Sequence, residues 1–196
     1  MGSATAAVPA RERALSGGTA VWVFMAVEVL TFGLFLVVHT WGWRADPGGF
    51  AEGQARLHPG SAAVGTVLLL VGSAFAYRAV LAAEEERARG CAGWLAAAAL
   101  AGVAFSANKL AEYADPGLAG VTLSTNMFWF GYLFITGMHL LHVIGGVGIL
   151  GWLAARVGRG GLGGEGVAHV QAAAAYWHLV DVVWLLVFPV IYRMHP

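Results

Sequence analysis

The stretch WVFMAVEVLTFGLFLVVHTW, residues 22–41, contains one acidic side chain, Glu28, and no lysine or arginine. A helix that rises 1.5 Å per residue needs about 20 such residues to cross roughly 30 Å of hydrocarbon. Four later segments have a comparable length and apolar character. The sequence therefore predicts an all-α polytopic membrane protein, a five-transmembrane-helix bundle. The expected spans are 19–41, 61–83, 91–113, 125–153 and 169–192.

The composition agrees with a lipid environment. Of the 196 residues, 59% are hydrophobic and 11% are charged, whereas soluble domains have about 25% charged residues. The formal net charge is zero, which argues against nucleic acid as a partner. The single cysteine, Cys91, excludes an internal disulfide, and no Cys/His cluster suggests a zinc site.

The chain is expected to hold one membrane domain, residues 19–193, after a polar N-terminal tail, residues 1–18. The tail lacks an apolar core before a cleavage site, so it is interpreted as retained rather than as a signal peptide. Residues 42–60 and 156–166 are expected to be loops, the second flexible and glycine-rich.

The basic residues of the loops predict a cytoplasmic N-terminus and an outside C-terminus. More of them fall on the N-terminal side of the membrane than on the other. The inner group is Arg11, Arg13, Arg87, Arg89, Arg156 and Arg159, and the outer group is Arg44, Arg56 and Arg193.

Five titratable residues are expected at a similar depth inside the bilayer: Glu28, His139, His142, His178 and Asp181. Their spacings of three place His139 with His142, and His178 with Asp181, on common helix faces. Such residues usually face the interior of a bundle. The layer could be a metal, haem or proton-relay site, or a set of interhelical hydrogen bonds that fixes packing.

A haem between helices would need axial ligands on opposite sides of the ring, such as His178 against His139 or His142. A stack of two haems would need two pairs of ligands at separate depths, and the sequence offers one layer. Structural polar packing or contact with lipid headgroups is therefore favoured over a bound redox centre. For Glu28, a functional role and a simple interhelical hydrogen bond are both open.

Several residues near the ends of the segments are expected to serve the interface or the packing. Lys109 and Glu112 are expected to form an ion pair at the outer interface. His39, Trp129 and Tyr192 are expected to be interfacial. Small residues in the fourth segment should let helices approach closely. They are Gly137, Gly145, Gly146 and Gly148.

Residues 175–193, AYWHLVDVVWLLVFPVIYR, closely resemble the last helix of cytochrome oxidase subunit III. The family's Tyr-Trp-His-x-x-Asp-x-x-Trp core falls on Tyr176, Trp177, His178, Asp181 and Trp184. This motif is highly specific.

The resemblance extends over residues 20–193. The run FWFGYLFITGMHLLHVIGG resembles the family's Gly-x-His-x-x-His-Val helix, which places the two histidines on His139 and His142. KLAEY, residues 109–113, resembles the end of the preceding family helix, and Glu28 matches the family's acid in the first segment.

The chain also departs from the mitochondrial type of the family. That type has seven helices, whereas this sequence starts at what looks like the third. The five segments resemble the short forms of bo-type quinol oxidases and of the accessory protein of bacterial nitric oxide reductases. The mitochondrial type has an arginine about ten residues before the helix acid, where this chain has Gly18. An arginine-anchored lipid is therefore not expected at that point.

The resemblance implies an accessory subunit without redox centres, bound to a subunit I-type catalytic protein in a bacterial plasma membrane. It would stabilise that protein, hold phospholipid and support proton uptake. Haem and copper, or haem and iron, would lie in the partner. The alternatives are an accessory subunit of nitric oxide reductase and a stand-alone b-type cytochrome. A transporter is disfavoured because the sequence has no inverted repeat.

Overall fold

A computed structural model describes residues 18–163 and 165–193. Five helices in these ranges are long and apolar enough to cross a membrane, which confirms the predicted all-α polytopic fold. A short helix, α2, and a 3₁₀ turn, η1, lie between them. The elements are α1 (Gly18–Ala45), α2 (Pro47–Ala55), α3 (Pro59–Glu84), α4 (Ala88–Tyr113), η1 (Pro116–Leu118), α5 (Met127–Gly160) and α6 (Gly166–Tyr192).

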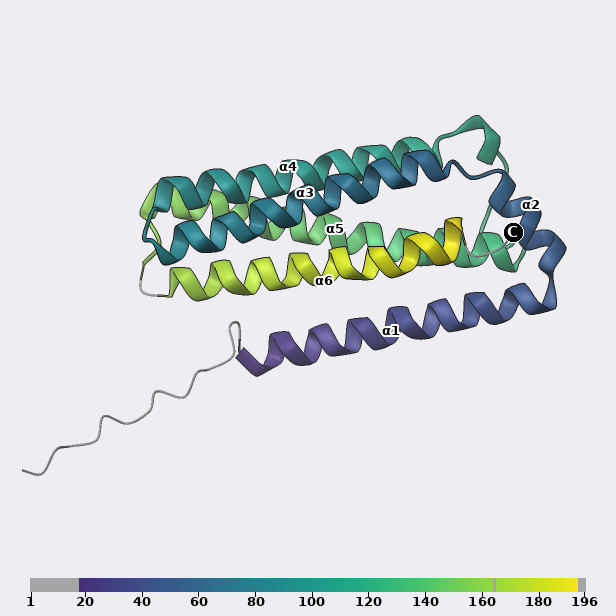
Figure 1. The fold of residues 1–196 in the computed structure, drawn as a ribbon, viewed down its shortest axis with the longest axis horizontal. Helices are drawn as coiled ribbons and strands as arrows, with labels where there is room; N and C mark the ends of the chain where they lie inside the picture. Colours follow the sequence, from purple (N-terminus) through teal and green to yellow (C-terminus); the bar gives the residue numbers. More distant parts are fainter. Residues whose placement is uncertain (1–17, 164, 194–196) are drawn as a thin grey trace, which may run out of the picture.

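The helices α3, α4, α5 and α6 form a four-sided bundle in which each helix packs against two others (Figure 1). Helix α1 runs along the outside of this bundle and contacts α5 and α6. The α3–α4 and α5–α6 connections lie at the end of the bundle where α1 begins. The opposite end carries α2 and the α4–α5 connection.

Helix α2 lies in the segment 42–60, which was predicted as a loop. Asp46 caps the helix by accepting a hydrogen bond from the backbone N–H of Gly49 at 2.9 Å, and Pro47 occupies the first turn. The side chain of Phe50 is fully buried and packs against Phe128 of α5, with ring centroids 5.4 Å apart. The Asp46 cap and the buried Phe50 side chain therefore stabilise a helix in a segment whose composition predicts a loop.

Helix α5 extends beyond its predicted end at residue 153. It continues through the expected glycine-rich loop to Gly160 and ends at Gly161, whose φ of 75° breaks the helical path. Asn126 caps the other end by accepting a hydrogen bond from the backbone N–H of Trp129 at 2.9 Å. At 1.5 Å per residue the helix is about 50 Å long, so it must tilt in the bilayer or project beyond it.

Trp177 lies at the centre of the four-helix bundle and is 1% exposed. Glycines of three other helices make room for its indole. A Cβ atom added at Gly72 of α3, Gly102 of α4 or Gly146 of α5 would lie 3.1, 2.5 or 3.0 Å from an indole atom. Small residues here admit one large side chain, so that all four helices meet around it.

The predicted role of the glycines in the fourth segment is only partly correct. Gly146 lies against Trp177, and a Cβ at Gly145 would be 3.6 Å from the Tyr176 hydroxyl. Gly137 and Gly148 have nothing within 4 Å of such a Cβ. Spacing along a helix identifies small residues, but it does not reveal which of them face a neighbour.

Candidate functional site

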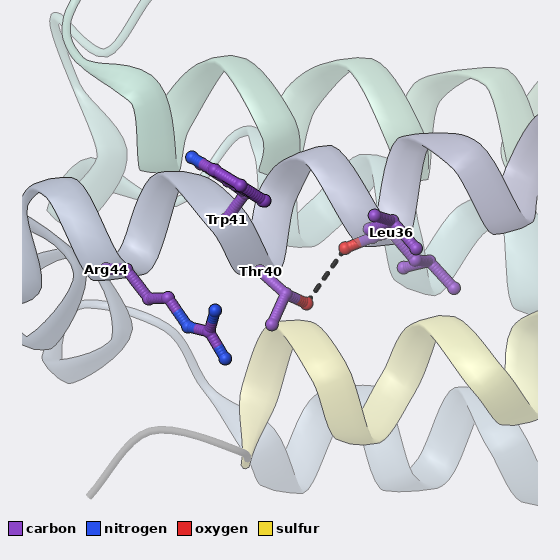
Figure 2. A pocket seen from close by; sticks show the side chains of 5 residues that line it. Leu36, Thr40, Trp41 and Arg44 are labelled. Carbon is purple, nitrogen blue, oxygen red and sulfur yellow. Dashed lines mark hydrogen bonds between the residues drawn. The ribbon is translucent and has the colours of Figure 1, made fainter.

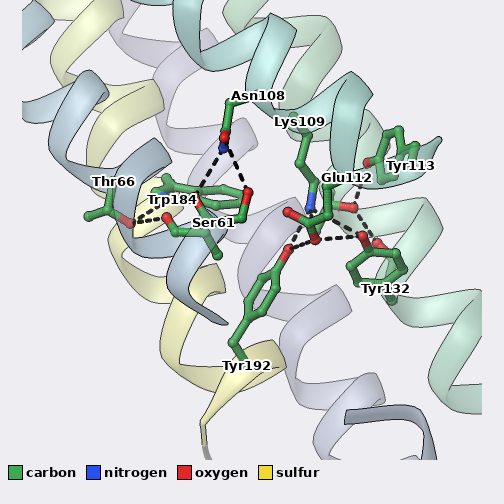
Figure 3. A network of polar contacts seen from close by, with 11 residues as sticks. Ser61, Thr66, Asn108, Lys109, Glu112, Tyr113, Tyr132, Trp184 and Tyr192 are labelled. Carbon is green, nitrogen blue, oxygen red and sulfur yellow. Dashed lines mark hydrogen bonds and ion pairs between the residues drawn. The ribbon is translucent and has the colours of Figure 1, made fainter. Parts of the chain in front are cut away.

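The most extensive polar cluster lies near the end of the bundle that carries α2, between α4, α5 and α6 (Figure 3). Lys109 Nζ lies 3.0 Å from Glu112 Oε1, and both side chains are 1% exposed. The hydroxyls of Tyr132 and Tyr192 donate to the same carboxylate oxygen at 2.7 and 2.6 Å. We call these four residues the Lys109 cluster.

Aromatic rings surround the ammonium group of this cluster. Lys109 Nζ lies 4.7 Å from the ring centroid of Tyr132, 5.2 Å from that of Tyr192 and 5.6 Å from that of Trp184. A cation over aromatic faces is stabilised by the ring quadrupoles, and more so where water is absent. The charged pair is therefore solvated by protein groups from three helices.

This geometry corrects the position expected for Lys109 and Glu112. The two residues form an ion pair, but the pair is buried in the bundle rather than exposed at the interface. Tyr192, expected as an interfacial anchor, is likewise buried, and so is Trp129. The sequence could not show this because the tyrosines that close over the pair are 20 and 80 residues away from Glu112 along the chain.

A second contact joins α1 to the bundle, near the middle of both α1 and α5. His142 Nε2 of α5 lies 3.1 Å from Glu28 Oε2, and His142 Nδ1 lies 2.7 Å from the backbone carbonyl of Met138. A carbonyl can only accept, so Nδ1 carries a proton. The contact between Nε2 and Glu28 then holds one proton, on either the imidazole or the carboxyl group.

A third contact joins α3 to α6. Ser73 Oγ lies 2.8 Å from Asp181 Oδ2 and 3.0 Å from His178 Nδ1. His178 and Asp181, predicted to lie on one helix face, are thus bridged by a serine of another helix. Ser73 was missed because a lone serine in an apolar helix carries no distinguishing signal in the sequence.

His139 has a different environment from the other histidines. Its imidazole is buried, stacks on Trp184 with centroids 4.9 Å apart, and meets the edges of Phe105 at 5.6 Å and Phe32 at 6.4 Å. Neither ring nitrogen has a hydrogen-bond partner within the described ranges. The ring is held by aromatic packing.

The five residues predicted as one polar layer therefore occupy three separate environments. Glu28 pairs with His142, His178 and Asp181 share Ser73, and His139 stands among aromatic rings. Among residues 18–163 and 165–193, no group of three or more His, Cys, Asp or Glu side chains is placed to hold a metal ion.

The aromatic residues of the α6 motif each reach a different neighbour. The Tyr176 hydroxyl donates to the backbone carbonyl of His142 on α5 at 3.0 Å. Trp177 fills the glycine-lined space described above. Trp184 donates from Nε1 to Thr66 Oγ1 of α3 at 2.9 Å. The motif therefore joins α6 to α3 and α5 by hydrogen bonds and, through Trp177, packs it against α4 as well.

His39 is buried rather than interfacial. Its ring lies 4.9 Å from that of Phe50 and 5.8 Å from that of Phe128, beneath α2. A Cβ added at Gly131 of α5 would overlap the imidazole. Phe50 of α2, a helix that the sequence did not predict, covers it together with Phe128 of α5.

Several surface cavities border α1. One, of about 560 Å³, lies between α1, α5 and α6 near the start of α1 and is lined by apolar and aromatic side chains that include Phe24, Trp152 and Tyr176. Another, of about 280 Å³, lies near the end of α1 beside Trp41 and Arg44 (Figure 2). Both are apolar hollows with few polar groups.

The fold and these contacts define a class of protein: a polytopic helical bundle whose internal polar side chains mostly bind one another across helices. The family model for cytochrome c oxidase subunit III matches residues 60–195. The chain belongs to this family.

Curated relatives agree with this assignment. The heme-copper oxidase subunit I+III of Aeropyrum pernix is 29% identical over 89% of this chain, which spans only 22% of that longer protein. The probable cytochrome c oxidase subunit 3 of Mycobacterium leprae is 30% identical, covering 93% of this chain and 89% of the relative. The quinol oxidase subunit 3 of Bacillus subtilis is 25% identical, covering 88% and 84%.

Proposed function

We propose that this chain is a redox-free accessory subunit of a respiratory haem-copper oxidase, bound to a catalytic subunit of type I. The observation that carries the proposal is the subunit III family match over residues 60–195. The relative from Aeropyrum pernix, named subunit I+III, supports a partner of type I, because its name places both subunits in one polypeptide.

The internal contacts fit a structural role. Three sets of polar contacts join different helices: Glu112 with Tyr132 and Tyr192, Glu28 with His142, and Ser73 with His178 and Asp181. Buried polar groups of this kind specify which helices pair and in what register. Haem and copper chemistry would then belong to the partner subunit.

The geometry argues against the alternative of a b-type cytochrome. His139 is enclosed by the rings of Trp184, Phe105 and Phe32, which occupy the space beside its nitrogens. The nitrogens of His142 already face Met138 and Glu28. A haem would have to displace these contacts before His178 could serve as a second axial ligand.

Phospholipid is a proposed structural ligand of the subunit. The cavity of about 560 Å³ beside α1 has an apolar lining and lies near the inner end of the helices, where His169 borders it. Its volume suits part of an acyl chain, and the aromatic side chains Phe24, Trp152 and Tyr176 suit the interfacial zone of a bilayer.

The location is proposed to be the bacterial plasma membrane, with the N-terminus in the cytoplasm and the C-terminus outside. Arg87 and Arg89 lie at the α3–α4 turn, and Arg156 and Arg159 lie near the end of α5, so four basic residues share the end where α1 begins. At the opposite end, Arg56 is engaged locally by the Gly117 carbonyl, 3.0 Å from its Nε. The positive-inside rule favours this orientation.

The proposal is tested by deleting the chain from its source cell and comparing membranes with and without it. The expected result is an unchanged haem spectrum per catalytic subunit, with oxygen consumption that decays during turnover and recovers on complementation. Normal, sustained oxygen consumption without the chain would contradict the supporting role. Loss of nitric oxide consumption instead would favour the nitric oxide reductase alternative.

A further inference from the structure

The face formed by α3 and α6 exposes a polar group where hydrocarbon is expected. His178 is the thirteenth residue of α6, about 18 Å from the start of that helix. Its side chain is only partly buried within this chain. Ser73, its hydrogen-bond partner, lies near the middle of α3. The polar group is therefore near the middle of the bilayer.

The hydrogen bonds leave one nitrogen of His178 available. Ser73 Oγ has a single proton, which it donates to Asp181 Oδ2. It must then accept from His178 Nδ1–H. Nε2 is left as an unprotonated acceptor, with no hydrogen-bond partner within the described part of the chain.

The residues around His178 are apolar and exposed. Val182 and Leu185 follow it on the same side of α6, one and two turns away, and Leu70 lies one turn from Ser73 on α3. An apolar surface with a hydrogen-bonding group at its centre is typical of contacts between transmembrane helices. We call Leu70, Ser73, His178, Val182 and Leu185 the α3–α6 patch.

The outward face of α1 shows what a lipid-facing surface of this protein looks like. Its exposed side chains over the middle of the membrane are aliphatic: Val27, Leu30, Leu34 and Val37. Placing aliphatic side chains against lipid has no free-energy cost, whereas placing an imidazole nitrogen there without a hydrogen-bond partner has a large one. The α3–α6 patch is therefore unsuited to lipid and suited to another protein.

We infer that the α3–α6 patch is the surface on which a transmembrane helix of the catalytic subunit docks, with a hydrogen-bond donor of that helix bound to His178 Nε2. The inference rests on the proposed function for the identity of the partner. The donor is a serine, threonine, asparagine, tyrosine or tryptophan side chain near mid-membrane. Leu70, Val182 and Leu185 then pack around it.

Site-specific photo-crosslinking in native membranes tests this surface. A benzophenone amino acid replaces Val182 in the patch or, as a matched control, Leu34 on α1, which is similarly exposed. The expected result is a crosslink from position 182 to the haem-bearing catalytic subunit, identified by peptide mass, and none from position 34. Both variants must co-purify with that subunit.

The outcomes separate the two proposals. If no catalytic subunit co-purifies with the unmodified chain, the proposed function fails. If it co-purifies but crosslinks from position 34 and not 182, only the docking surface fails. A crosslink from position 182 to a second copy of this chain, or to lipid alone, also overturns the inference.

A substitution at the proposed hydrogen bond gives an independent test. His178→Phe keeps an aromatic ring and the Ser73–Asp181 bond but removes the acceptor. The expected result is a fall of roughly three- to tenfold in the yield of the 182 crosslink, on the scale of one hydrogen bond in a membrane. Leu141→Phe on the exposed side of α5 is the control and should leave the yield unchanged. An unchanged yield in His178→Phe would overturn the role of the imidazole.

Discussion

Helix α1 and the bundle of α3 to α6 hold their side chains in different ways. In the bundle, Lys109 and Trp177 are each 1% exposed and are surrounded by groups from several helices. On α1, Leu30 is 72% and Trp41 is 71% exposed. The bundle carries its own buried network, whereas α1 is joined to it by one polar contact, that of Glu28, and by ring packing. The rings are those of Phe24, Phe32, Phe35 and His39.

Because of this difference, α1 and the bundle should respond differently to mutation. Substitutions inside the bundle should lower the stability of the whole protein, because buried groups such as Lys109 and Trp177 contact two or three other helices. Substitutions at the α1 contact should change where α1 lies while the bundle stays folded.

The largest effect is expected in the Lys109 cluster. Lys109→Met leaves the buried carboxylate of Glu112 without its cation, which should lower the free energy of unfolding by about 3–5 kcal/mol. Denaturant unfolding in detergent, followed by tryptophan fluorescence, measures it. The double variant Lys109→Met/Glu112→Gln should recover most of the loss, because the remaining groups are neutral. A single variant as stable as the parent would contradict the importance of the charge pair.

The next effect is expected where Trp177 meets its glycines. Gly102→Ala places a methyl group 2.5 Å from Trp177 and Val147 atoms, and the overpacking should cost about 1–3 kcal/mol. Gly93→Ala on the same helix is the matched control, because nothing lies within 4 Å of its added methyl group. Gly93→Ala should be neutral or stabilising by up to about 1 kcal/mol. Equal effects of the two changes would refute close packing at Trp177.

The Ser73 bridge should behave as one unit. Asp181→Ala and Ser73→Ala are each expected to cost about 1–3 kcal/mol, because either change leaves a polar partner unsatisfied. The double variant should cost much less than the sum of the two. Strictly additive losses in denaturant unfolding would show that the two residues act independently.

The smallest effect on stability is expected at the α1 contact. Glu28→Leu should change the free energy of unfolding by less than about 1 kcal/mol, the usual scale of one hydrogen bond in a membrane. Distances between spin labels at positions 30 and 141, in a Cys91→Ala background, should instead broaden as α1 loses its polar link. A cooperative loss of the bundle in Glu28→Leu would break the distinction between the two regions.

The sequence predicts much of this architecture but less of the site. Length and apolarity suffice for five spans, because the bilayer fixes how long each must be. Partners across helices cannot be derived in this way. Ser73 and Tyr132 lie 108 and 20 residues from the carboxylates that they bind, and nothing in their local sequence marks them.

The burial of individual side chains is likewise poorly predicted from the sequence. The charge of Lys109 and the position of His39 near a segment end both suggest the interface, yet each is covered by aromatic residues from elsewhere in the chain. Depth along a helix follows from residue number. The side of the helix that is covered depends on the neighbours, which composition does not specify.

The central claim is that this bundle works without a redox centre of its own, beside a catalytic subunit. The most direct test is to purify the tagged chain from its native membranes in mild detergent, record a reduced-minus-oxidised spectrum and identify its companions by peptide mass. The expected result is that a large subunit co-purifies and that haem and copper signals are present. When the complex is dissociated, these signals should stay with the large subunit and not with this chain. A chain that emerges alone and colourless, or alone with its own haem spectrum, would contradict the account.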